Sequence, residues 1–107
     1  MAKIDIETIK DEIIKALMPL KPKKILLFGS YAYGNPNDES DIDLFLIKDI
    51  SKEKARDFKV QARLNLRKLI QKYKIGFDIL VANENFIKSR DDYFYKVELK
   101  NAKVLYE

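Results

Sequence analysis

The sequence contains no cysteine and no histidine among its 107 residues. The absence of cysteine excludes disulfide bonds and thiol catalysis, and the absence of histidine excludes a Ser-His-Asp triad. The usual zinc sites are excluded as well, because they depend on these two residue types. Any metal that the chain binds must therefore be held by oxygen ligands, a donor set that favours Mg²⁺, Mn²⁺ or Ca²⁺.

Long apolar runs, internal repeats and Gly/Ser-rich linkers are also missing. No segment approaches the roughly 18 apolar residues of a membrane span, and the start, MAKIDIETIK, lacks the apolar stretch of a signal peptide. We therefore expect a cytoplasmic protein with no membrane partner. With 47% hydrophobic and 36% charged residues, the composition is typical of globular proteins, and we expect residues 1–107 to form one domain.

Positive charge is concentrated in one segment of the chain. Residues 52–74 carry nine basic and two acidic side chains, whereas residues 1–51 and 75–107 each carry a small acidic excess. Such a segment suits an anionic partner, such as a nucleotide, a nucleic acid or an acidic protein. It equally suits a helix with a solvated lysine face, so the charge alone leaves both interpretations open.

Hydrophobic spacing predicts helices that alternate with strands. Apolar residues at positions 6, 9, 13 and 17 predict an amphipathic helix that ends near Pro19, and a longer helix is predicted over residues 52–74, with Gly76 as its stop. Strands are predicted at 24–28, 41–47, 77–82 and 103–106, the last at an edge. A short helix and a turn at Asn101 are expected before the last strand. This order favours an α/β fold, a small mixed sheet with helices packed on it.

Two aspartates stand at the front of the strand DIDLFLI. Asp41 and Asp43 would point to the same face with Cα atoms about 6.5–7 Å apart, so their carboxylates can bind one divalent cation or bracket two. A cation would also relieve the repulsion between them. Asp78, in the apolar strand FDILVA, would share that face if the two strands are neighbours. The structural alternative is that Asp41 caps a turn while the other two aspartates face solvent.

A Gly-Ser pair follows the first predicted strand, in LLFGS. Gly29 would let the backbone approach a ligand closely, and a helix that begins at Ser30 would direct free N–H groups at an anion. The Ser30 hydroxyl can hydrogen-bond a phosphate oxygen. Such dipeptides are ordinary turns when they occur alone. The order of strand, Gly-Ser, turn-rich loop and D-x-D strand is what points to a phosphate ligand.

The stretch GSYAYGNPNDESDIDLFLI resembles the G-S…D-x-D signature of the DNA polymerase beta nucleotidyltransferase superfamily, in particular its minimal nucleotidyltransferase (MNT) branch. The matching positions are Gly29, Ser30, Ala32, Gly34, Ser40, Asp41, Ile42, Asp43 and Leu44. Asp78 stands where the family has its third carboxylate. The resemblance implies a polymerase-beta-like nucleotidyltransferase fold.

The resemblance also implies roles for individual residues. Asp41, Asp43 and Asp78 would be catalytic and would bind Mg²⁺, as one or two ions, with Mn²⁺ as an alternative. Gly29, Ser30 and Ser40 would bind the nucleotide.

A partner protein is implied as well, because MNT proteins are commonly antitoxins paired with a helical HEPN ribonuclease toxin. The modification in such pairs is transfer of AMP from ATP to a tyrosine of the toxin. A chain of 107 residues has little room for a second domain that binds a polymer. We therefore expect a protein adenylyltransferase antitoxin that uses ATP and acts on a HEPN toxin.

The sequence departs from the family at Tyr31 and Tyr33, where many relatives carry an arginine that serves as a phosphate ligand. The substitute cations that we consider are Lys48, Lys52, Lys54 and Arg56. The departure favours one alternative, a catalytically weak binding module that neutralises a toxin by occlusion. A third reading is a nucleotidyltransferase for a small molecule or an RNA end. Nucleic-acid binding is not favoured, because no aromatic residue is interleaved with the exposed basic positions of residues 52–74.

Overall fold

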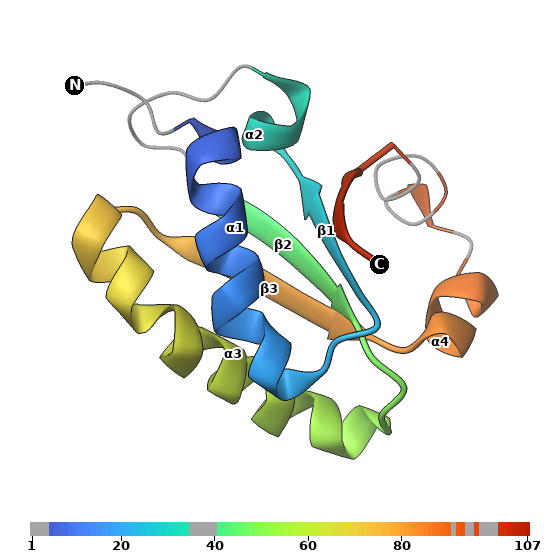
Figure 1. Cartoon of the computed structure of the whole chain (residues 1–107). Coiled ribbons are helices and arrows are strands. Elements are labelled where there is room, and N and C mark those ends of the chain that lie inside the picture. Colours follow the sequence, from blue (N-terminus) through green and yellow to red (C-terminus); the bar gives the residue numbers. More distant parts are fainter. Residues whose placement is uncertain (1–4, 35–40, 91, 94–95, 97–100) are drawn as a thin grey trace.

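The computed structural model describes residues 5–34, 41–90, 92, 93, 96 and 101–107. Helices and strands alternate along most of this part of the chain (Figure 1). In chain order the elements are α1 (Ile6–Leu17), the 3₁₀ helix η1 (Met18–Leu20), β1 (Lys24–Phe28), α2 (Ser30–Tyr33), β2 (Ile42–Ile47), α3 (Lys52–Tyr73), β3 (Phe77–Ala82), α4 (Glu84–Ser89) and β4 (Lys103–Tyr106).

The four strands form one mixed sheet in the order β3-β2-β1-β4. Strand β1 pairs antiparallel with both β2 and β4, whereas β2 and β3 are parallel. A parallel pair needs a long crossover connection, and α3 supplies it. The mixed sheet with packed helices and the edge position of the last strand are both confirmed.

Helices α1 and α3 pack on the same face of the sheet (Figure 1). The alternation of side chains along each strand produces this face, because every second residue of β1, β2 and β3 is apolar and all of these but Val81 are buried. The strand residues of this core are Ile25, Leu27, Ile42, Leu44, Leu46, Phe77 and Ile79, and those of the two helices are Ile9, Ile13, Leu17, Phe58, Ala62, Leu66 and Leu69. At about 1.5–3 kcal/mol for each fully buried aliphatic side chain, this layer is the main source of stability.

The opposite face of the sheet carries a smaller apolar cluster. Leu26, Phe45 and Ile47 are its buried members, and Phe28 and Ile87 are among the side chains that pack against it. Since the alternation that buries Ile42 and Leu44 under the helices points the intervening residues the other way, this second face is also the one that receives the aspartate of β2.

Helix α1 has the predicted bounds, and its end has a clear cause. Proline at position 19 lacks the N–H that would continue the helical hydrogen bonds. The chain tightens into η1, and the side-chain amide of Asn65 on α3 donates to the carbonyl oxygen of Ala16 at 3.0 Å. This bond satisfies a carbonyl at the end of α1 and fixes the end of α1 against α3.

The long helix ends within one residue of its predicted bounds, 52–74, but the prediction that Gly76 stops it was wrong. Helix α3 ends at Tyr73, and Lys74 closes it in the left-handed conformation, with φ of 56° and its backbone N–H donating to Ile70 O at 2.9 Å. Glycine is the usual residue at this position, so a lysine there gives no signal in the sequence. Gly76 lies two residues further on and has another role, described below.

The end of the chain differs from expectation in one element. Helix α4 was not predicted, and it is capped by Asn83, whose side chain accepts a hydrogen bond from the N–H of Phe86 at 2.7 Å. Most of the short helix expected before Asn101 lies outside the described residues. The turn at Asn101 and strand β4 are confirmed. In the part of the chain that the structure describes, no helix is both long enough and apolar enough to cross a membrane.

The left-handed residue at the end of α3 allows a stability test. Replacing Lys74 with glycine removes the steric cost of a Cβ at positive φ, so Lys74→Gly is expected to stabilise the protein by about 0.5–1 kcal/mol in urea unfolding. The exposed helical Lys68 offers a matched control, because Lys68→Gly should destabilise by about 1 kcal/mol. Destabilisation by both substitutions would contradict the left-handed cap.

Candidate active site

The candidate site begins at the first residues of β2. Asp41 immediately precedes the strand and Asp43 is its second residue. Ile42 and Leu44 are both fully buried under α1 and α3. The side chain of Asp43 therefore points to the opposite face of the sheet, because successive residues of a strand alternate.

Asp43 lies in a row of three residues across the sheet. In the register of the strands it stands opposite Phe28 of β1 on one side and opposite Asp78 of β3 on the other. Phe77 and Ile79 are buried in the core under the helices, so Asp78 also points to the opposite face. The expectation that Asp78 shares a face with the D-x-D pair, if the strands are neighbours, is confirmed.

Asp41 is held close to a glycine of the neighbouring segment. The backbone N–H of Ile42 donates to the carbonyl oxygen of Gly76 at 3.0 Å, which aligns the segment before β3 with the start of β2. A Cβ atom on Gly76 would come within 2.7 Å of Asp41 Oδ1, closer than ordinary van der Waals contact. Gly76 therefore makes room for the Asp41 carboxylate, a role that its place after a helix did not reveal.

A second glycine makes room for Asp43. Gly29 follows β1 directly, has φ of 75°, and precedes the short helix α2, which begins at Ser30, the start considered from the sequence. A Cβ on Gly29 would overlap Asp43 Oδ2. The Gly-Ser pair thus lies at the same end of the sheet as the three aspartates, and the close approach that Gly29 allows is to a carboxylate of the site itself.

The electrostatics of the site centre on Asp43. Its pKa is raised to about 6, first because it is partly buried, then because the negative charges of Asp78 and Asp41 oppose its ionisation. The negative charges of Asp41 and Asp78 thus act on Asp43, and among the described residues no cationic side chain forms an ion pair with the three carboxylates. A divalent cation would reverse this penalty, since it favours the ionised forms.

The donor set fits a hard divalent cation. Within the described residues no three acidic side chains converge tightly enough to form a ready-made metal cage. Three carboxylates at one end of a sheet, with two of them in register, nevertheless provide the oxygen ligands that Mg²⁺ or Mn²⁺ prefers. Asp41, Asp43 and Asp78 are thus the residues that could hold it.

The substitute cations considered from the sequence lie elsewhere. Lys48 follows the far end of β2, about 16 Å along the strand from Asp43, and its amino group donates to Leu20 O at 2.6 Å and Lys21 O at 3.1 Å. Helix α3 starts at that end too, because Lys52 and Ala82 line a common hollow. The prediction that Lys48 supplies the phosphate-binding cation was wrong, and the first turn of α3, with Lys52 and Lys54, begins at the same end of the sheet as Lys48. Ser40, the third predicted nucleotide-binding residue, lies outside the described residues.

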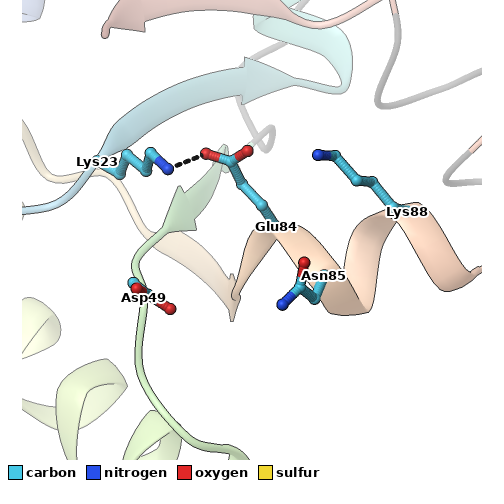
Figure 2. A pocket seen from close by; sticks show the side chains of 5 residues that line it. All are labelled: Lys23, Asp49, Glu84, Asn85 and Lys88. Atoms are coloured by element: carbon cyan, nitrogen blue, oxygen red, sulfur yellow. Dashed lines mark ion pairs between the residues drawn. The ribbon is translucent and has the colours of Figure 1, made fainter.

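Another polar hollow, of about 150 Å³, occurs at a different place on the surface (Figure 2). It is lined by Lys23, Asp49, Glu84, Asn85 and Lys88. Lys23 Nζ and Glu84 form an ion pair at 2.5 Å, which raises the pKa of Lys23 and lowers that of Glu84. Because its acidic and basic groups neutralise one another, this hollow lacks the uncompensated charge of the aspartate site.

The raised pKa of Asp43 predicts a pH-dependent stability. The folded state binds a proton more tightly than the unfolded chain, whose aspartates titrate near 3.9, so the ionised carboxylate destabilises the fold fully above pH 6 and not at all below about pH 4. In EDTA, Asp43→Asn should therefore raise Tm at pH 7.5 and change it much less at pH 4. Asp11→Asn, on the exposed surface of α1, controls for the loss of one charge. An equal effect at both pH values would contradict the shift.

Comparison with known proteins places this geometry in a family. Residues 11–107 match the model described as "Polymerase beta, Nucleotidyltransferase". Two proteins of Methanocaldococcus jannaschii are similar in sequence. "Putative protein adenylyltransferase MJ0604" is 33% identical over 85 residues, which cover 78% of each chain, and "Putative protein adenylyltransferase MJ0141" is 35% identical over 82 residues, which cover 72% of this chain and 74% of the relative.

Two solved structures share the fold. One is a toxin-antitoxin structure with AMP-PNP, with a TM-score of 0.60 and 23% identity, and the other is a mutant of the toxin-antitoxin pair MntA-HpeT, with a TM-score of 0.59 and 21% identity. Each match covers 91% of this chain and 72% of the other. The resemblance, the fold class and the nucleotidyltransferase class of enzyme inferred from the sequence are confirmed: the chain belongs to the polymerase beta nucleotidyltransferase family.

Proposed function

We propose that this protein transfers AMP from ATP to a tyrosine of a cognate HEPN ribonuclease toxin and thereby acts as an antitoxin. The observation that carries the proposal is the row in which Asp43 and Asp78 lie in register, with Asp41 two residues before. The names of the two archaeal relatives support protein adenylylation, and the toxin-antitoxin structures that share the fold support a toxin as the partner.

The proposed roles follow from the positions of the residues. Asp41, Asp43 and Asp78 would hold Mg²⁺ or Mn²⁺, as one or two ions, which would supply neutralisation of the phosphate charge. The backbone at Gly29 and the hydroxyl of Ser30 would donate hydrogen bonds to phosphate oxygens, with Ser40 as a further candidate donor. Asp78 would favour loss of the proton from the tyrosine hydroxyl. The tyrosine Oη would then bond to the α-phosphorus of ATP as the bond to pyrophosphate breaks.

The location of the site suits an acceptor that belongs to another protein. Strand β3 is an edge strand of the sheet, and Asp78 on it is exposed. A tyrosine on a partner can therefore approach Asp78 from solvent without passing between packed elements. Positioning by the partner would supply much of the rate, as in other phosphoryl-transfer reactions.

A second candidate function is neutralisation of the toxin by occlusion without catalysis. The observation that favours it is the position of Lys48, which was considered as a phosphate-binding cation. Its amino group is bonded to two carbonyl oxygens at the far end of β2. In the described residues, Tyr31 is buried and Tyr33 is half exposed where many relatives carry an arginine. The proposal of catalysis therefore depends on the carboxylates rather than on a phosphate-binding cation.

Transfer of the label from [α-³²P]ATP tests the two functions directly. With Mg²⁺ and the HEPN protein of the adjacent gene, the wild type should label the toxin, and Asp43→Asn and Asp78→Asn should each reduce the rate by about 100-fold or more, because each removes a ligand of the cation. Asp49→Asn, at the other end of β2, is the matched control and should keep the wild-type rate. Full neutralisation of the toxin by Asp43→Asn without any labelling would favour occlusion instead.

The contact between Gly76 and Asp41 gives a more specific test. A methyl group at position 76 would displace the Asp41 carboxylate, which can rotate away, so Gly76→Ala should cost less than about 1 kcal/mol of stability yet slow labelling by about 10-fold or more. If the effect passes through Asp41, adding Gly76→Ala to Asp41→Asn should cause little further loss. If the two substitutions lowered the labelling rate additively in the double variant, the effect of Gly76→Ala would not pass through Asp41.

A further inference from the structure

A groove lies between α1 and α3, on the side of the molecule away from the aspartates. The two helices run antiparallel, since Glu12 contacts Lys72 while Ala16, one turn later, contacts Asn65. The groove has a volume of about 430 Å³ and is lined by Glu12, Lys15, Ala16, Asn65, Lys68, Leu69 and Lys72. Leu69, 7% exposed, and the small side chain of Ala16 make part of its surface apolar.

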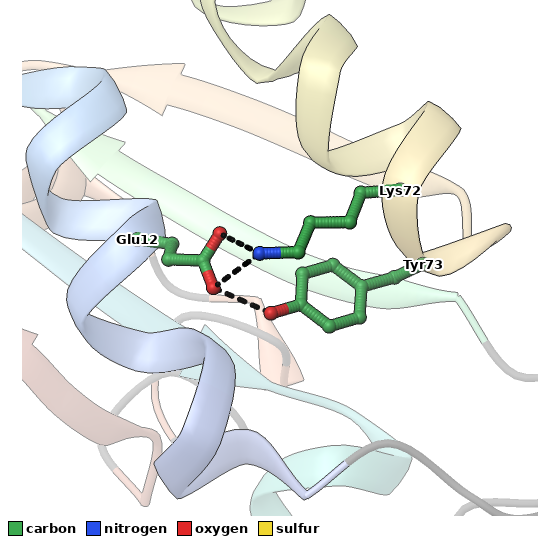
Figure 3. A network of polar contacts seen from close by, with 3 residues as sticks. All are labelled: Glu12, Lys72 and Tyr73. Atoms are coloured by element: carbon green, nitrogen blue, oxygen red, sulfur yellow. Dashed lines mark hydrogen bonds and ion pairs between the residues drawn. The ribbon is translucent and has the colours of Figure 1, made fainter.

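Part of the polar lining of the groove is already paired. The hydroxyl of Tyr73 donates to Glu12 Oε1 at 2.5 Å, and Lys72 Nζ lies 3.3 Å from both oxygens of the same carboxylate (Figure 3). These contacts lower the pKa of Glu12, first through the hydrogen bond from Tyr73, so the carboxylate stays ionised and bound. Asn65 is likewise occupied by Ala16 O. The carboxylate of Glu12 and the amide of Asn65 therefore bond the two helices to each other and are not available to a ligand.

Two lysines of the lining remain available to a ligand. Lys15 and Lys68 are exposed, and neither forms an ion pair with any residue that the structure describes. With Glu12 neutralised by Lys72, the groove carries an excess of positive charge. Lys68 belongs to the segment 52–74, which holds nine basic and two acidic residues, so the groove lies beside the most basic surface of the chain.

An exposed apolar side chain lies beside the groove on α3. Leu64 stands four residues before Lys68, hence on the same side of the helix, and is 53% exposed. Large aliphatic groups open to water beside a groove are typical of surfaces that bind another protein.

We propose that the groove between α1 and α3 is a docking site for an acidic amphipathic helix of a partner protein. The apolar side of that helix would cover Ala16, Leu69 and Leu64, and its flanking carboxylates would meet Lys15 and Lys68. The size of the groove suits the side chains of one or two helical turns. The charge of the groove selects an acidic partner over a basic one.

The chemistry of the groove favours a protein over a nucleic acid. Single-stranded RNA binds through exposed aromatic rings interleaved with cations. No aromatic residue lines the groove among the residues that the structure describes, and Tyr73 beside it is bonded to Glu12 through its hydroxyl. The groove also lies across the sheet from Asp43, so a helix bound there leaves the aspartates accessible, and the proposal does not depend on nucleotidyl transfer.

Binding of a designed peptide to the full chain tests this site. The probe is a fluorescein-labelled amphipathic helix of about 16 residues, with leucines on one face and glutamates on the others, measured by fluorescence anisotropy. We expect a Kd on the order of 10 µM, weakened at least about 10-fold by Lys15→Glu/Lys68→Glu and by scrambling the peptide. Leu64→Asn should also weaken binding, because it removes an apolar contact.

Arg56→Glu/Arg63→Glu is the matched control, since it makes the same change of total charge, with both substitutions on α3. These arginines lie about 120–140° around α3 from Lys68 and should change Kd less than about 3-fold. If both double variants lost peptide affinity equally, the proposed docking site would be refuted, because the peptide would then be attracted to the basic charge of the protein in general. Absence of peptide binding at 100 µM, or tighter binding of a single-stranded RNA of about 16 nucleotides, would overturn it too.

Discussion

The candidate site depends on the parallel pairing of β2 with β3. In the observed register Asp43 stands opposite Asp78, and both side chains leave the face covered by the helices. A slip by one residue would turn Asp78 toward the core and bring Phe77 or Ile79 to the site. The apolar residues on either side of each aspartate prevent such a slip, since Ile42, Leu44 and Ile79 are fully buried. The same hydrophobic pattern that forms the core therefore sets the positions of the carboxylates.

The negative charges at one end of the sheet repel one another and therefore lower the stability of the fold. Asp43 lies between Phe28 and Asp78, where partial burial and two like charges raise its pKa to about 6. Two of the three glycines of the chain, Gly29 and Gly76, each leave the space that an aspartate side chain occupies. Functional sites commonly retain such unfavourable groups, and here the unfavourable charge supports the proposal that the site binds a cation.

Most of the fold and the shared face of the aspartates were predictable, because alternation along strands and helical spacing along α1 are properties of the sequence itself. The structure differs where the deciding contacts are not local in sequence. Apolar spacing predicted the end of α3 to within one residue, but Lys74 adopts a conformation usually taken by glycine, so the residue that caps the helix could not be identified from residue type. Helix α4 is only six residues long, too short for a hydrophobic period to appear. Lys48 was considered for the site because it is near in sequence, whereas β2 carries it to the other end of the sheet.

The direction of β2 also separates the charges of the molecule. The strand runs from the aspartates to the start of α3, and α3 then returns along the other face of the sheet, so its basic excess lies across the sheet from the carboxylates and does not neutralise them. Ion pairs between the basic side chains of α3 and the aspartates would have neutralised both charges and left neither available to a ligand. Because the sheet keeps them apart, the carboxylates are available to the divalent cation proposed above, and Lys15 and Lys68 are available to the acidic helix proposed for the groove.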